Sequence, residues 1–124
     1  MEALPSVVDP RPVASARDHP LARLLERVDA RAATSFVHEQ LAVLAAHDRE
    51  HGTNLLLVLE LALDHHDRNA AARAAFMHRN TFRRQLRNAL ELIDADLDCP
   101  EERLALHLAL KLRALRHERL RRAS

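Results

Sequence analysis

The chain has 124 residues, a typical length for one domain, and 48% of them are hydrophobic, which is enough for a modest core. Its formal net charge is only +1, and a single cysteine excludes an internal disulfide. The sequence contains neither an apolar run long enough to cross a membrane nor a secretory signal. We therefore expect a cytoplasmic protein that does not associate with membranes.

The composition favours helices over strands. There is one glycine, there are three phenylalanines, and tryptophan and tyrosine are absent, while leucine, alanine and arginine dominate. We predict an all-α fold of five to six helices. Because small helices lined by leucine bury limited area, we also expect a partner chain to contribute to stability.

The first 19 residues differ from the rest of the chain. Three prolines between residues 5 and 12 are incompatible with a regular helix, so we expect residues 1–19 to form a flexible leader. The remaining residues, 20–122, are expected to form one helical domain.

Two amphipathic helices are predicted next. Pro20 suits the first turn of a helix, and Thr34 or Ser35 is expected to cap the second, which ends at Gly52. The predicted apolar stripes are Leu21, Leu24, Leu25 and Val28 in the first helix, and Phe36, Val37, Leu41 and Leu44 in the second.

A very apolar segment follows, from Asn54 to about His65. It is apolar on nearly all sides, which predicts the central and most buried helix, with Thr53 as its cap. We expect this helix to support the segment that follows it.

Residues 67–93 have the pattern of a helix-turn-helix. Asp67 is placed to cap a short first helix, whose alanines would allow a close helix crossing. Phe76 and Met77 are expected to fill the corner, and His78 to lie near the cap of the second helix. The second helix would then be placed to enter a DNA major groove.

The second helix of this unit has two distinct faces. At about 100° per residue, Phe82, Leu86, Ala89, Leu90 and Ile93 share one arc. The opposite arc is basic and polar, and residues 68–90 contain six arginines and no acidic residue. Such a face indicates DNA binding, although an arginine-rich amphipathic helix can equally be a solvated surface. The residues on the opposite arc are Asn80, Arg83, Arg84 and Arg87.

Three segments of the chain resemble one family. The segment HRNTFRRQL at 78–86 resembles the HRNTLRYRL-type signature in the C-terminal helix-turn-helix of PucR/CdaR-type bacterial transcription regulators. HDREHGTNLL at 47–56 and ADLDCPEERLALHLALKL at 95–112 resemble the segments that flank this signature. The resemblance covers roughly residues 20–115, in the right order.

Some positions depart from the family pattern. The family tends to have glycines before the first motif helix and after the recognition helix, where this chain has residues 65–67 and Asp94. Arg84 and Gln85 replace the more usual tyrosine and arginine. These departures concern the DNA sequence that is read more than the fold.

The resemblance implies sequence-specific binding of double-stranded DNA and regulation of transcription. A lone helix-turn-helix reads few base pairs, so we expect a homodimer on a palindromic site. Effector sensing in this family is assigned to a domain absent here, so no cofactor and no small-molecule site are expected. The expected base-reading side chains are Arg79, Asn80, Arg83 and Arg87; Thr81 and Arg84 are expected to bind phosphate, and Arg68 and Arg73 to bind the DNA backbone from the first motif helix.

Acidic and basic segments follow the recognition helix. Residues 91–102 carry six acidic side chains, and Pro100 begins a last helix with Glu101 and Glu102 in its first turn. Its basic end, residues 113–122, suits the helix dipole, and the alternative is additional phosphate contact. The predicted apolar stripe of this helix is Leu104, Leu108, Leu112 and Leu115, broadened by Leu106 and Leu110.

Other chemistry is disfavoured. His47 and His51 share a helical spacing but form no HExxH motif, and Cys99 lacks a second cysteine, so no metal site is expected. No nucleophile–base pattern or glycine-rich loop indicates an enzyme. A minor-groove arm in the leader is disfavoured because its two arginines are balanced by two aspartates.

A second interpretation belongs to a different class. The chain could be a truncated helical interaction module that dimerises with a full-length regulator and modulates it. The missing sensor domain and the altered turn residues motivate this alternative.

Overall fold

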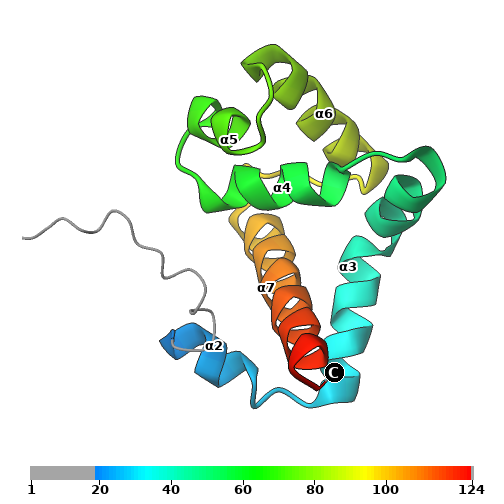
Figure 1. Ribbon diagram of the computed structural model, residues 1–124, viewed down its shortest axis with the longest axis vertical. Coiled ribbons are helices and arrows are strands. Elements are labelled where there is room, and N and C mark those ends of the chain that lie inside the picture. The colour runs from blue at the N-terminus through cyan, green and yellow to red at the C-terminus, as the bar shows by residue number, and fades with distance from the viewer. Residues whose placement is uncertain (1–18, 124) are drawn as a thin grey trace, which may run out of the picture.

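The computed structural model describes residues 19–123, and these form six helices and no strand (Figure 1). The predicted all-α fold is therefore confirmed for this part of the chain, while the leader predicted for residues 1–19 lies, except for His19, outside the described residues. The helices are α2 (Pro20–Leu25), α3 (Ala30–His51), α4 (Leu55–Asp64), α5 (Arg68–Ala74), α6 (Arg79–Leu92) and α7 (Pro100–Ala123).

Helix α4 lies at the centre of the molecule. It packs against α3, α5, α6 and α7, and Figure 1 shows it between the α5–α6 pair on one side and the long helices α3 and α7 on the other. Val58, Leu59 and Ala62 are completely buried. The prediction that this apolar helix is central and buried is confirmed, and α4 forms the platform on which α5 and α6 rest.

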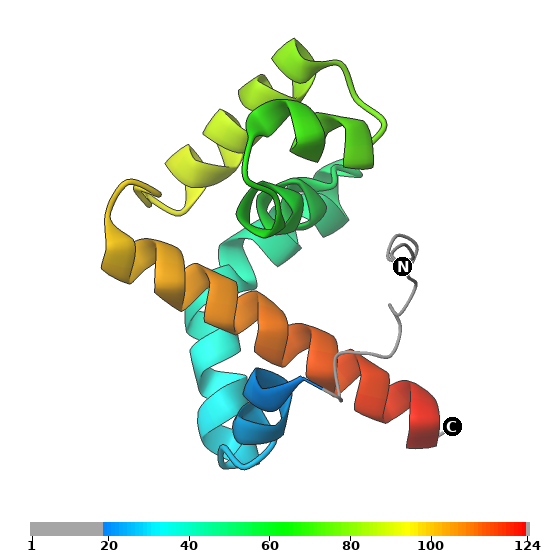
Figure 2. The ribbon, with the colours of Figure 1, turned by 90° about the vertical axis from the view of Figure 1, so that its left-hand side faces the viewer.

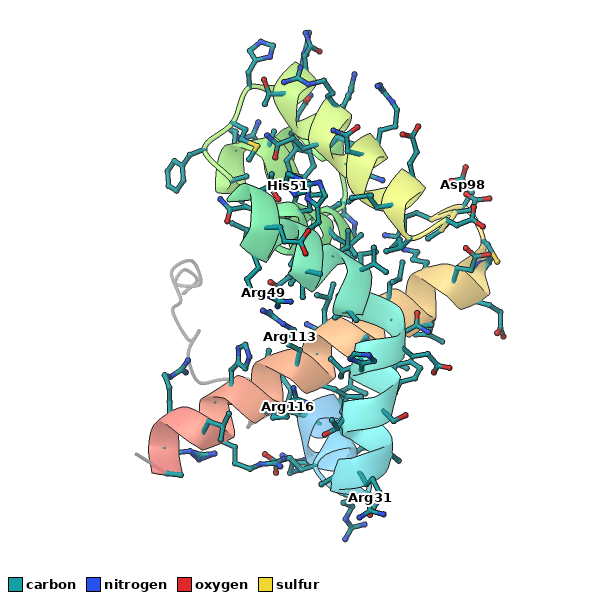
Figure 3. The ribbon with its side chains drawn as sticks, turned by 90° about the vertical axis from the view of Figure 1, so that its right-hand side faces the viewer. Arg31, Arg49, His51, Asp98, Arg113 and Arg116 are labelled. Carbon is teal, nitrogen blue, oxygen red and sulfur yellow. The ribbon has the colours of Figure 1, made fainter. Side chains whose placement is uncertain are left out.

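Helix α3 begins earlier than predicted. The Asp29 carboxylate accepts a hydrogen bond from the Ala32 N–H at 3.0 Å, so Asp29 is the N-cap and the predicted cap at Thr34 or Ser35 is wrong. Thr34 instead lies inside the helix, where its hydroxyl accepts a hydrogen bond from the Arg116 guanidinium of α7 at 3.3 Å (Figure 3). The predicted stripe is buried at Val37, Leu41 and Leu44.

The apolar faces of α2 and α7 differ from the predictions. In α2 the buried residue is Ala22, whereas Leu21 and Leu24 are exposed because this short helix packs mainly against one side, that of α7. In α7 the buried side chains are Leu106, Ala109, Leu110 and Leu115, and Leu104 is 60% exposed. Leucines lie on several sides of α7, so their spacing alone does not predict which side is buried. The packing of α3 and α4 against α7 determines it.

One carboxylate joins α3 to α4. Asp48 accepts hydrogen bonds from the Thr53 hydroxyl and from the N–H groups of Leu55 and Leu56, the latter two at 2.8 and 3.0 Å. We call this arrangement the Asp48 clamp. The prediction that Thr53 caps α4 is therefore wrong. Thr53 donates its hydroxyl hydrogen bond to Asp48, and the Asp48 carboxylate accepts the hydrogen bonds from the N–H groups of the first turn of α4. Gly52, as predicted, ends α3 in a left-handed conformation with φ 65°.

Candidate nucleic-acid interface

Helix α5 is short and closely packed. The Asp67 carboxylate accepts a hydrogen bond from the Ala70 N–H at 2.7 Å, which confirms the predicted cap. Ala71 and Ala72 are buried, and α5 packs against both α4 and α6. The small side chains permit the close approach that the alanine-rich sequence predicted.

The turn between α5 and α6 has an unusual residue at its corner. Phe76 adopts a left-handed conformation with φ 58°, and its N–H bonds to the Arg73 carbonyl at 3.0 Å while the Met77 N–H bonds to the Ala72 carbonyl at 2.9 Å. These two bonds form a Schellman motif, which usually has glycine at the left-handed position. Phe76 is 96% exposed, so the prediction that it fills the corner is wrong. The left-handed backbone turns Phe76 outward, and the half-buried Met77 packs against the core.

Helix α6 has the two faces that its sequence predicted. Its N-cap is His78, whose Nδ1 accepts a hydrogen bond from the Asn80 N–H at 3.1 Å. Phe82, Leu86 and Ala89 are buried against the core. These anchors fix the rotation of α6 about its axis, so the side chains on the opposite face have a defined direction.

Most of the predicted site residues lie on the surface of α5 and α6. Thr81 is half-buried, and so is Arg68, whose guanidinium donates to the Ala62 carbonyl at 3.4 Å. Arg68 is therefore directed toward the end of α4, unlike the others. The exposed members are Arg73, Arg79, Asn80, Arg83, Arg84 and Arg87.

The exposed arginines are not neutralised by neighbouring carboxylates. Within residues 19–123, no ion pair joins any of the five exposed arginines of α5 and α6 to an acidic side chain. By contrast, on the α4–α7 side Asp64 lies 2.9 Å from His107 Nε2 and 3.8 Å from Lys111 Nζ. The surface formed by α5 and α6 therefore carries a net positive charge that is available to an anionic partner.

Helix α6 ends at a second strained position. Asp94 has φ 53°, its N–H bonds to the Glu91 carbonyl at 3.2 Å, and the Ala95 N–H bonds to the Leu90 carbonyl at 3.0 Å. This is again a Schellman motif, and Asp94 occupies the position at which glycine is favoured.

Comparison with protein families identifies this arrangement. Residues 55–112 match the family model described as the PucR C-terminal helix-turn-helix domain. Residues 55–112 are a PucR-type helix-turn-helix domain. The resemblance predicted from the signature at 78–86 is thus confirmed over α4, α5, α6 and the first half of α7. The match begins at Leu55, so α2 and α3 lie outside it, although the predicted resemblance began near residue 20.

Two further comparisons add no relative. No protein of curated function and no solved structure matches the chain significantly. None of the helices within residues 19–123 is long and apolar enough to cross a membrane.

The acidic connector of the PucR-type domain has a local structural role. The Asp98 N–H donates to the Asp96 carboxylate at 2.9 Å, and the Asp96 N–H donates to the Glu102 carboxylate at 2.8 Å. Leu97 is buried between these polar turns. Figure 3 shows Asp98 in the loop between α6 and α7. These acidic side chains therefore order the loop that follows α6.

The histidines do not gather into a metal-binding group. Among the described residues, no three His, Cys, Asp or Glu side chains converge. The rings of His47 and His51 stack with centroids 4.3 Å apart, and His51 Nδ1 donates to the His47 carbonyl at 3.2 Å. His47 Nδ1 lies 3.1 Å from Thr53 Oγ1, next to the Asp48 clamp. Both histidines thus take part in the junction between α3 and the PucR-type domain.

A pocket of about 510 Å³ lies between α2, α4 and α7, and none of its lining residues belongs to α5 or α6. Burial raises the pKa of the Glu60 carboxyl, and Asp64 adds to this rise, while Arg113, Lys111 and His107 oppose it. A pocket of this volume can hold a small organic molecule. The expectation that this chain lacks an effector site therefore stays a prediction.

Sequence reasoning missed two residues of the PucR-type domain and its junction. Phe76 was assigned to the interior because it is apolar, although its place directly after a helix end was a sign of a left-handed corner. Asp48 was not assigned any role, since its partners lie five to eight residues away across a turn.

Proposed function

We propose that this protein is a sequence-specific DNA-binding transcriptional regulator, whose helix α6 enters the major groove. The observation that carries the proposal is the exposed face of five arginines on α5 and α6 of a PucR-type helix-turn-helix domain, none of which pairs with a carboxylate within residues 19–123. Double-stranded DNA offers the dense negative charge that such a face requires. The proposal includes no catalytic step and no cofactor, and it places the protein in the cytoplasm together with DNA.

The side chains of α6 are assigned by their chemistry. Arginine can bind the guanine O6 and N7 atoms with two hydrogen bonds, and asparagine can do the same at adenine N6 and N7. The four side chains assigned to base edges are exposed. Asn80, Arg83 and Arg87 lie on the face of α6 away from the buried Phe82 and Leu86, and Arg79 projects from the first turn of the helix. The residues assigned to bases are Arg79, Asn80, Arg83 and Arg87.

Phosphate contacts are assigned to the predicted site residues that are not assigned to bases. Arg84 is exposed beside the base-reading face, and the half-buried Thr81 lies near the start of α6. Arg73 projects from α5, and the Arg68 guanidinium carries further N–H donors besides the one that bonds to the Ala62 carbonyl. Such contacts fix the orientation of a protein on DNA but carry little sequence information.

We further propose a homodimer, because one helix-turn-helix reads only a half-site. Val43 and Leu92 line a groove between α3, the end of α6 and the start of α7, and they are 52% and 41% exposed. A second copy that covers these side chains would remove apolar surface from water. Sedimentation equilibrium that yields a monomer at micromolar concentration, with and without DNA, would contradict the homodimer.

The function is tested with fluorescence anisotropy. The purified chain is titrated against a pool of random labelled duplexes, bound duplexes are recovered and sequenced, and selected duplexes are titrated at several salt concentrations. The proposal requires tight binding to a subset of sequences that persists at moderate salt. Weak binding to every duplex that disappears with salt would contradict sequence-specific recognition and would show only non-specific electrostatic binding.

A second candidate is a helical interaction module that pairs with a full-length regulator. The exposed Leu21 and Leu24 of α2, 45% and 61% exposed, favour a protein partner for the end of the molecule distant from α5 and α6. Heterodimer formation without DNA binding would establish this candidate. Retained DNA binding by the isolated chain would favour the regulator.

A further inference from the structure

Phe76 is held in a position that is unfavourable for the free protein in two ways. Its φ of 58° lies in the left-handed region, which L-residues with a β-carbon avoid. Its aromatic side chain is 96% exposed, so it contributes almost no buried apolar area to the fold. Strained residues of this kind cluster at functional sites.

The turn itself does not require an aromatic side chain. Both hydrogen bonds that close the Schellman motif involve only backbone atoms of residues 72, 73, 76 and 77. At the end of α3 the corresponding left-handed position is occupied by Gly52. Glycine at position 76 would therefore serve the fold at least as well as phenylalanine does.

Phe76 lies beside the face assigned to DNA. It precedes the His78 cap by two residues and Arg79 by three, so it borders the N-terminal end of α6. Figure 2 shows the loop between α5 and α6 at the end of the molecule opposite α2. In the proposed complex the N-terminal end of α6 is the part of the recognition helix that approaches the bases.

We propose that Phe76 is a DNA-contacting residue that packs on an apolar surface at the edge of the groove, either a thymine 5-methyl group or a deoxyribose ring. Phenylalanine is one of the side chains that make apolar contact with the thymine methyl group. The contact removes from water a ring that the free protein leaves exposed. This inference rests on the proposed function, because it names a contact within the same protein–DNA interface.

The test compares three variants on duplexes selected by the unmodified protein. Phe76→Ala and Phe76→Gly remove the ring, and Leu24→Ala removes a similarly exposed apolar side chain from α2 as a matched control. We expect both Phe76 variants to lose about tenfold in affinity, since a buried phenylalanine ring contributes of that order or more, and the control to bind as before. The log–log salt slope should not change, because no charge is removed. Phe76→Gly should also melt at a temperature at least equal to that of the unmodified protein, which separates lost binding from lost folding.

The source of the contact is identified by a second series. Selected duplexes are synthesised with deoxyuridine in place of each thymidine in turn, which removes the 5-methyl group alone. If one substitution weakens the unmodified protein but not Phe76→Ala, the contact is that methyl group; if none does while the Phe76 variants remain weak, the contact is deoxyribose.

Three results would overturn the inference. Equal affinity of Phe76→Ala and the unmodified protein would show that the ring does not contact DNA. A change in the monomer–dimer equilibrium of Phe76→Ala without DNA would assign the ring to a protein interface. No binding by the unmodified protein would reject the proposed function itself, and the inference with it.

Discussion

The five exposed arginines of α5 and α6 set how steeply DNA affinity should fall with salt. Each neutralised phosphate contributes about −0.9 to the slope of log K against log salt. If each of the five exposed arginines, including those assigned to bases, neutralises one phosphate, the slope is roughly −4.5 for each bound chain. Between 50 and 200 mM salt, that slope corresponds to a loss of affinity of about 500-fold. Arg84→Gln should make the slope shallower by about 0.9 for each bound chain, with little effect on folding because Arg84 is exposed.

The control for this prediction removes the same charge elsewhere. Arg31 is exposed at the start of α3, and Figure 3 shows it at the end of the molecule far from α6. Fluorescence anisotropy at five or so salt concentrations gives the slope for the unmodified protein, Arg84→Gln and Arg31→Gln. We expect Arg31→Gln to retain the original slope. Equal changes in the two variants would refute the reasoning, because binding would then depend on total charge and not on the α5–α6 face.

Four further measurements test individual residues. Arg83→Ala should weaken binding to a selected duplex by about 1–3 kcal/mol and relax the sequence preference, and unchanged affinity on every duplex would reject its assignment. Asp48→Ala should lower the free energy of unfolding by about 2–3 kcal/mol in urea titrations, and Asp48→Asn by less, because the α4 N–H groups lose their acceptor. Asp94→Gly should raise it by about 0.5–1 kcal/mol by removing left-handed strain, and a decrease would contradict this account. Burial, with Asp64, raises the pKa of Glu60 above the ordinary carboxyl value of 4.5, so ionisation of Glu60 lowers the stability of the fold as the pH rises from 4.5 through the pKa of the native state. Glu60→Gln should therefore melt at a higher temperature than the unmodified protein at neutral pH, and an equal or lower melting temperature would contradict this account of Glu60.

Several features that depend on neighbouring residues were predictable from sequence, although the Asp29 cap of α3 was not. The cap at Asp67, the position of His78 near the start of α6 and the two faces of α6 follow from residue type and a helical period, and the structure contains all of them. The surface position of the α6 arginines was predictable because a separate set of apolar residues, which includes the buried Phe82, was available to pack into the core. The assignment of individual arginines to bases or phosphates stays a prediction.

Features that depend on distant packing were not predictable in the same way. The buried side of α7 is selected by α3 and α4, and the spacing of its leucines did not distinguish Leu104 from Leu106. The Asp48 clamp forms across a turn, so residues next to α4 in sequence predict Thr53 as the cap, whereas the acceptor is Asp48. Phe76 was misplaced because hydrophobicity alone suggested burial, whereas the backbone of the corner decides its direction.

The Asp48 clamp has a mechanical consequence. Helix α3 has 22 residues and is therefore about 33 Å long, yet its C-terminal end is fastened to the first turn of α4, the helix that supports α5 and α6. It also packs against α7, so α3 is held to the PucR-type domain both at the clamp and along α7. A force applied near Arg31, well outside residues 55–112, would therefore reach α4, the platform of α5 and α6, without direct contact to either of these helices.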